Sequence, residues 1–170
     1  MPLLGLLLTL LLAPAAGSNG LDGRTIRTGC RQGECSWLRV RRVETLRTVP
    51  EGRLRRIVGR TGNSAHRDGS IPARPPARTS WSKADDIGYA FCSTRRPAFA
   101  FAGEDGKLIL HFLDLFDLAG YQYTSAGLYM RLCHGLAEVP DARRLRAMGY
   151  RPGTRSAQIE GAGVEAMTRF

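Results

Sequence analysis

Lysine is almost absent from this basic chain, since Lys83 and Lys107 are its two lysines among 25 Lys plus Arg residues. An excess of arginine beside many Ala, Gly and Pro residues is what the codons of a GC-rich genome produce. The distribution of charge is more informative, because residues 18–84 hold 15 cations and 5 anions while residues 85–170 hold ten of each. Codon bias does not load one half of a chain. We therefore expect a basic surface in the first half and an anionic partner for it.

Long hydrophobic runs are lacking too, except for residues 3–16, a Leu-rich stretch that ends in small residues. About 14 residues are too few to cross a bilayer of about 30 Å, which takes about 20 helical residues. The length suits a secretory signal peptide, with a small-residue cleavage pattern near Ala16. We expect residues 1–17 to be this signal peptide, the mature chain to have no transmembrane segment, and the protein to be periplasmic or secreted. The alternative is a buried N-terminal helix of a cytosolic protein.

Familiar catalytic motifs are missing: the chain has no G-x-S-x-G elbow, no H-E-x-x-H and no phosphate-binding loop. The segment from Cys92 to Arg96 differs from a phosphate-binding thiolate loop, because its arginines follow the cysteine after only two and three residues. His111 and Asp114 are the best candidates for an acid–base pair, although a strand that ends at Leu113 and a following turn explain their spacing better. We expect no catalytic residue, no cofactor and no metal site.

Four cysteines are present, and an even number in an exported chain predicts disulfides. Four cysteines allow three pairings. We favour Cys30–Cys35, whose spacer contains a glycine and can form a turn, together with Cys92–Cys133. The metal-binding interpretation is weaker, because the first pair has no matching second pair of ligands.

Alternation of apolar and polar residues predicts two β-hairpins. The first joins residues 36–49 to residues 53–60, and the second joins residues 97–102 to residues 108–113 through a Gly-containing turn. A further short strand is expected at 89–92. The eight arginines between positions 39 and 60 would then lie on one solvated hairpin.

Two short helices are expected in the second half of the chain. The first begins with Thr124 or Ser125 as its cap and runs to about residue 134; the second covers residues 140–148. Together the elements predict an α+β fold: a small antiparallel sheet of two hairpins, with one or two short helices on one face and disulfide links. We expect one globular domain at 18–149 with a Pro-rich loop at 61–80, and a loosely ordered tail at 150–170.

The function that these features favour is that of an exported, non-catalytic bacterial envelope protein. It would bind an anionic envelope component or an acidic protein through the hairpin arginines, of which we single out Arg39, Arg41, Arg53 and Arg55. Nucleic acid is not expected as a partner, because Trp37 and Trp81 are more typical of a core edge than of base stacking. Two alternatives remain: a hydrolase-type enzyme acting on an envelope polymer, and an interaction or inhibitor module that uses loop 61–80.

The signal-peptide prediction can be checked by N-terminal sequencing of exported protein. The mature chain should begin between Ala16 and Ser18, because cleavage follows small residues at the end of the apolar run. Cytosolic protein that still begins at Met1 would contradict the predicted signal peptide, and with it the argument that the cysteines form disulfides.

Overall fold

The structure, a computed structural model, describes residues 20–103 and 105–169. The expected signal peptide, residues 1–17, lies outside these residues. None of the helices in the described part of the chain is long and apolar enough to span a membrane.

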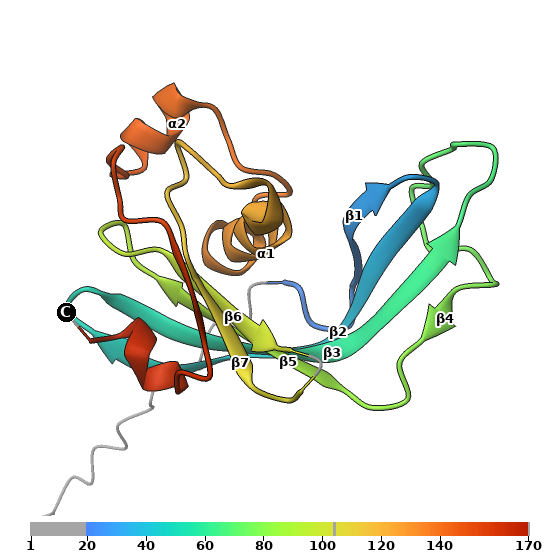
Figure 1. Cartoon of the computed structure of the whole chain (residues 1–170), viewed down its shortest axis with the longest axis horizontal. Helices are drawn as coiled ribbons and strands as arrows, with labels where there is room; N and C mark the ends of the chain where they lie inside the picture. The colour runs from blue at the N-terminus through green and yellow to red at the C-terminus, as the bar shows by residue number, and fades with distance from the viewer. Residues whose placement is uncertain (1–19, 104, 170) are drawn as a thin grey trace, which may run out of the picture.

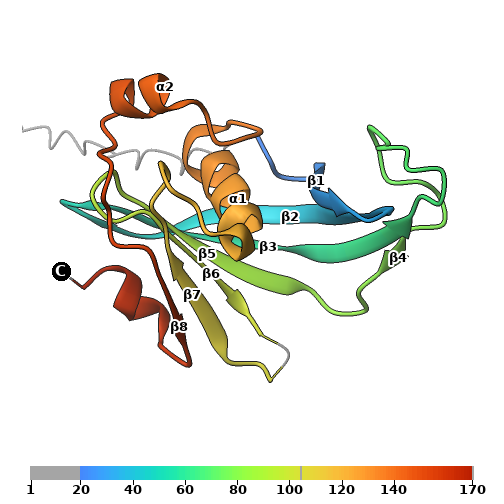
Figure 2. The same ribbon diagram turned by 45° about the horizontal axis from the view of Figure 1, so that its top comes forward.

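Eight strands form one antiparallel sheet that curves around the helix α1, Tyr123–His134 (Figures 1 and 2). Their order along the sheet is β1-β2-β3-β5-β6-β7-β8, and β4 pairs with the end of β3. The strands are β1 (Thr25–Arg31), β2 (Glu34–Val49), β3 (Gly52–Ala65), β4 (Ser80–Trp81), β5 (Asp86–Cys92), β6 (Ala98–Ala102), β7 (Leu108–Phe112) and β8 (Ala157–Glu160). The remaining elements are the 3₁₀ helix η1 (Gly120–Gln122), the helix α2 (Ala142–Ala147) and the 3₁₀ helix η2 (Val164–Met167).

The antiparallel sheet agrees with the prediction, but two hairpins understate its size. The predicted hairpin of residues 36–49 and 53–60 corresponds to β2 and β3, and the second hairpin corresponds to β6 and β7. β3 continues to Ala65, so the loop expected at 61–80 covers only residues 66–79. Strand β3 is longer than expected because its far end is paired on both sides, by β2 and by β4.

Two irregularities in register bend the long hairpin of β2 and β3. They lie between Val40 and Arg42 and between Thr45 and Arg47. Extra residues of this kind increase the local twist of a strand. Gly59 stands beside the first irregularity, where a Cβ atom would lie 2.5 Å from the carbonyl oxygen of Arg39, so the close approach of these backbones requires glycine. The bend makes the sheet concave toward α1 (Figure 2).

The middle strands are buried on both faces of the sheet. On the concave face, Phe99 packs in the core that includes Tyr129 and Leu132 of α1. On the opposite face, Leu110 and Phe112 of β7 lie in a second cluster, together with other buried residues of the sheet and of η2: Leu54, Phe91, Ala98, Ala100 and Met167. Burial on both faces explains why the sequences of β6 and β7 are apolar almost throughout.

The expectation of a loosely ordered tail at 150–170 is wrong. Residues 157–160 form β8 on β7, and Met167 of η2 is fully buried against the sheet. A four-residue strand and a four-residue 3₁₀ helix are too short to show a period in the sequence. The polar, Gly-rich composition of this segment therefore predicted a loose tail. The ordered domain therefore extends well past residue 149.

The helix α1 lies where it was expected, but its start is different. Thr124 and Ser125 are inside the helix, and Gln122 precedes it with no side-chain cap hydrogen bond. The end matches the expectation, because Gly135 adopts φ 69° and donates its N–H to the carbonyl of Arg131. The expected second helix is reduced to α2, which Asp141 caps by accepting from the N–H of Arg144 at 2.8 Å.

Two disulfides link the elements, in the pairing favoured from the spacing of the cysteines. Cys30 and Cys35 are register partners at the turn between β1 and β2, with Cα atoms 4.0 Å apart. Cys92 at the end of β5 is bonded to Cys133 near the end of α1, with Cα atoms 5.3 Å apart. The second bridge fixes the helix to the sheet.

We predict that Met167→Ala lowers the free energy of unfolding by about 2–5 kcal/mol, the usual range for a buried methionine. Stability should be lost because Met167 of η2 packs against the face of the sheet opposite α1. The control is Leu46→Ala, where the side chain is 43% exposed, so a change within about 0.5 kcal/mol is expected. Urea denaturation measures both, and equal effects would show that the C-terminal segment does not complete the core.

Candidate anion-binding site

Several arginines of the β2–β3 hairpin are already paired with carboxylates of the same chain. Arg41 Nη1 lies 2.6 Å from Asp85 Oδ2, and Arg60 Nε lies 3.7 Å from the other oxygen of this carboxylate. Glu44 forms ion pairs with Arg42 and with Arg56 on the neighbouring strand. The hairpin is therefore less positive toward solvent than its sequence indicates.

The four arginines singled out from the sequence do not form one surface. Arg39 stacks over the ring of Trp81 at 4.3 Å, and Arg41 is the partner of Asp85. Arg53 is exposed near the opposite end of the hairpin, opposite Thr48.

Arg55 is buried, which corrects its assignment to the anion-binding surface. Its side chain is 4% exposed, and Nη1 donates to the carbonyl oxygen of Leu132 at 2.6 Å. Burial and the nearby charge of Arg53 lower the pKa of Arg55. Alternation along β3 correctly predicts that Arg55 and Leu54 lie on opposite faces of the sheet. The sequence does not show, however, that α1 covers the face of Arg55. Carbonyl groups at a helix C-terminus carry partial negative charge and suit a buried cation.

A more concentrated basic group, which we call the basic cleft, lies where the β5–β6 loop meets the segment after α2. Arg95 and Arg96 come from the loop, and Arg151 and Arg155 come from the segment. One hollow of about 380 Å³ is lined by Arg95, Arg96, Phe112, Thr154, Arg155, Ala157 and Ile159. An adjoining hollow of about 460 Å³ shares Arg95 and Thr154 and adds Thr94, Gly149 and Arg151. Among the described residues, no acidic side chain lines either hollow.

Two arginines of the basic cleft, Arg96 and Arg155, repel each other. Arg96 stacks over the ring of Phe112 at 4.2 Å, and its pKa is lowered by burial and by the charge of Arg155. Within the described part of the chain, Arg95, Arg151 and Arg155 form no ion pair. A bound anion would relieve this repulsion, which makes the cleft chemically suited to one.

Hydrogen bonds hold both segments of the basic cleft in place. Ser93 Oγ accepts from the backbone N–H groups of Arg95 and Arg96 at 3.3 and 3.2 Å. Asp114 Oδ2 accepts from the N–H of Gly153 at 3.0 Å, which positions the second segment. The geometry of the arginine backbones is thus set before any ligand arrives.

The structure does not join His111 and Asp114 through a hydrogen bond. His111 is buried, with Nδ1 2.8 Å from Ser125 Oγ and Nε2 3.0 Å from Gln158 Oε1. Asp114 accepts instead from the backbone of Phe116 and Gly153. These contacts give both residues structural roles between elements. In the described residues, no group of three or more His, Cys, Asp or Glu side chains is placed to hold a metal ion.

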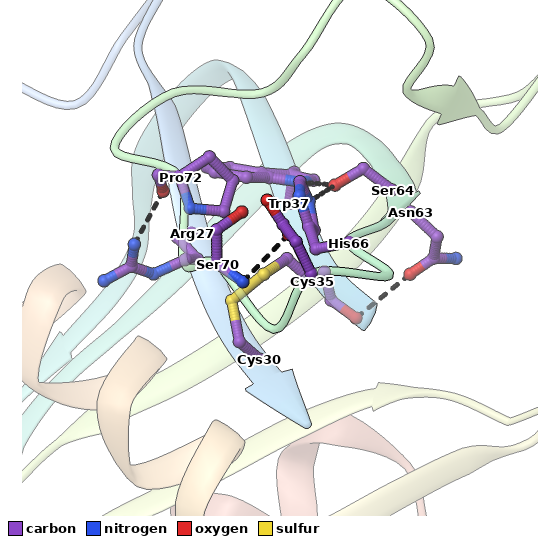
Figure 3. The surroundings of a disulfide bond; sticks show 11 residues. Arg27, Cys30, Cys35, Trp37, Asn63, Ser64, His66, Ser70 and Pro72 are labelled. Carbon is purple, nitrogen blue, oxygen red and sulfur yellow. Dashed lines mark hydrogen bonds between the residues drawn. A yellow bond between two sulfur atoms is a disulfide. The ribbon is translucent and has the colours of Figure 1, made fainter. Parts of the chain in front are cut away.

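The loop at 66–79 is fixed over the Cys30–Cys35 end of the first hairpin, as Figure 3 shows. The backbone N–H of His66 donates to the carbonyl of Gly33, and Arg27 Nη1 donates to the carbonyl of Pro72 at 2.7 Å. A role for this loop in binding a partner stays a prediction.

Both tryptophans have structural surroundings. Trp37 is 1% exposed and its indole N–H donates to Ser64 Oγ at 2.8 Å (Figure 3). Trp81 is partly exposed beneath Arg39. The first is a core residue rather than a surface for stacking a base or sugar.

Sequence reasoning missed the basic cleft because it averaged charge over half of the chain. The ten anions of residues 85–170 balance its cations, but Asp114 is buried and Asp85 is paired with arginines of the first half. The available signals were the consecutive arginines before Pro97 and the two arginines in the polar segment 151–155.

Comparisons with protein-family models, with curated proteins and with solved structures found no match to this chain.

The buried histidine leads to a prediction about pH. Burial lowers the pKa of His111 in the folded protein, so the unfolded chain binds more protons between the folded and unfolded pKa values. The free energy of unfolding should therefore fall as the pH drops below about 6.5, the usual pKa of histidine. Urea denaturation between pH 7.5 and about 5 should show a smaller slope for His111→Gln.

The matched variant is His134→Gln, whose histidine also has a pKa lowered by burial and by the charge of Arg53. Each single variant should remove part of the slope, and the double variant should remove more than either. A slope that persists unchanged in the double variant would contradict the assignment.

Proposed function

We propose that this is an exported, non-catalytic protein that binds an anionic component of the cell envelope through the basic cleft. The observation that carries the proposal is the convergence of Arg95, Arg96, Arg151 and Arg155 on two adjoining hollows without an acidic side chain. Lipid phosphates, anionic wall polymers and an acidic protein are the candidate partners.

Arginine suits such a partner because its planar guanidinium presents several N–H donors to phosphate or carboxylate oxygens. The ring of Phe112 holds Arg96 at one side of the first hollow. Arg95 borders both hollows, so an extended anion could contact arginines on both sides of it. A polymer or a membrane surface offers repeated anionic groups of this kind.

Export is part of the proposal and rests on two features. The apolar run at residues 3–16 has the length of a signal peptide, and two disulfides are typical of proteins from oxidising compartments. Both features support the proposal that the protein works in the periplasm or outside the cell.

The hairpin arginines are the competing location for the anion. Arg39, Arg41 and Arg53 were expected to bind the anion. However, Arg39 stacks on the ring of Trp81, and Arg41 is paired with the carboxylate of Asp85. An ion pair within the chain must be broken or shared before such an arginine can bind a ligand fully. In the described part of the chain, Arg95, Arg151 and Arg155 of the basic cleft form no ion pair, so a ligand can bind them without breaking one.

The proposal is tested by two triple variants that remove equal charge. One changes Arg95, Arg151 and Arg155 to Ser; the other changes Arg39, Arg41 and Arg53 to Ser. All six side chains are exposed and each variant lowers the formal charge from +10 to +7. Sedimentation with phosphatidylglycerol vesicles and with purified anionic wall polymer measures binding at about 0.1 M salt, where the Debye length is about 10 Å.

The cleft variant should lose about tenfold or more in affinity, equivalent to about 1.4 kcal/mol, and the hairpin variant should lose distinctly less. Thermal unfolding verifies that both variants are folded. Equal losses would mean that binding follows net charge alone, and a larger loss in the hairpin variant would return the site to the hairpin. Either result would overturn the proposed cleft.

A further inference from the structure

A second hollow of different chemistry lies between α1 and the concave face of the sheet. Its volume is about 230 Å³. The floor is formed by the sheet, with apolar side chains from β2, β3 and β6, and the roof by the first half of α1 with the residues before it. The lining residues used below are Phe101, Tyr121, Leu128 and Asp86.

Aromatic and aliphatic groups dominate this cavity. Phe101 and Tyr121 each contact the ring of His111 edge-on, with ring centres 5.4 and 5.3 Å apart. Tyr121 is 57% exposed, so its ring continues the apolar lining from the cavity to the rim. Apolar surface that remains open to water beside a concave site is typical of a ligand-binding pocket.

The cavity is independent of the basic cleft. His111 and Phe112 are successive residues of β7, so their side chains point to opposite faces of the sheet. His111 faces Ser125 of α1 and contacts the ring of Tyr121 at the cavity, whereas Phe112 lines the basic cleft. A ligand in one site does not touch the other.

One charged side chain, Asp86, lines the cavity, and it is acidic in a protein of net charge +10. Its Oδ2 accepts hydrogen bonds from the backbone N–H of Thr61 at 3.1 Å, from Thr61 Oγ1 at 2.7 Å and from Ser82 Oγ at 3.2 Å. Among the described residues, Oδ1 has neither a hydrogen bond nor an ion pair. Asp86 is exposed, and an ionised carboxylate only accepts hydrogen bonds, so a ligand that contacts it in place of water must bring a donor.

We propose that this cavity binds a small apolar amine: one aromatic ring or a short alkyl chain inside the cavity, with its ammonium group at Asp86. The size follows from the volume, since a cavity of about 150 Å³ accommodates benzene. The amine follows from Asp86, because a carboxylate attracts a cation and repels an acid. Apolar lining provides affinity, and Asp86 provides the preference among ligands of equal length.

The test uses three six-carbon ligands that differ only in their polar end: hexylamine, hexanol and hexanoate. Each is titrated into isotope-labelled, oxidised protein at about 0.15 M salt, and shifts of backbone amide resonances give the dissociation constants. Hexylamine should bind up to about fivefold more tightly than hexanol, the range of an ion pair open to solvent. Hexanoate should bind most weakly, and shifts should be centred on the cavity residues.

Three variants separate the cavity from non-specific binding. Leu128→Trp fills the cavity and should abolish binding of hexylamine, whereas the matched change Leu46→Trp at an exposed position should leave it unchanged. Asp86→Asn should retain binding of hexanol and lose the preference for hexylamine. The dispersion of the amide spectrum reports whether each variant is folded.

The proposal is overturned if hexanoate binds as tightly as hexylamine, if Leu128→Trp is folded and binds normally, or if none of the three ligands shifts the cavity resonances. Should Leu128→Trp fail to fold, the ligand series and Asp86→Asn decide. Because the arginine variants described above do not alter the cavity, failure here leaves the proposed anion binding intact.

Discussion

The packing of α1 into the curved sheet is the constraint on which the other features depend. The Cys92–Cys133 bridge joins the end of β5 to the end of this helix across 41 residues of sequence. In the chain-entropy model, closing a loop of that length stabilises the folded state by about 4 kcal/mol. At the same end, the helix covers Arg55 and offers it the carbonyl of Leu132. At the other end, the helix covers the apolar cavity. One helix therefore buries Arg55 and also forms the roof of the cavity.

A buried polar network beside this bridge connects the helix to the basic cleft. Tyr129 donates its hydroxyl to the carbonyl of Ser93 at 3.0 Å and lies 2.8 Å from the hydroxyl of Tyr150, which also contacts His134. Burial raises the pKa of Tyr129 and raises that of Tyr150 to about 12, so both hydroxyls keep their protons at neutral pH. Ser93 in turn holds the N–H groups of the two loop arginines. The position of the arginines therefore depends on side chains inside the domain, which gives the exposed cleft a rigid base.

One sheet separates two surfaces of opposite character. The cavity under α1 is lined mainly by apolar groups, with Asp86 as the charged residue among its described lining, while the edge formed by β7, β8 and the β5–β6 loop presents arginines. Successive side chains of β7 point to opposite faces of the sheet, and this alternation separates the cavity from the basic cleft. The C-terminal segment completes this arrangement: η2 fills the second face with Met167, and the residues before β8 provide Arg151 and Arg155.

Local rules in the sequence determined the main strands, the position of α1 with Gly135 at its end, and the favoured pairing of the cysteines. Most of these follow from residues that are close in the chain: alternation for a strand, glycine for a helix end, and a short spacer for Cys30 and Cys35, whose pairing leaves Cys92 for Cys133. Tertiary structure alone decided which faces are covered. Alternation predicted Arg55 on the surface, but α1 covers it. Composition predicted a loosely ordered tail at 150–170, but η2 packs on the sheet. The basic cleft belongs to the same class, because Arg95 and Arg155 are brought together by long-range packing, and the charge of a sequence window does not reveal which side chains share a surface.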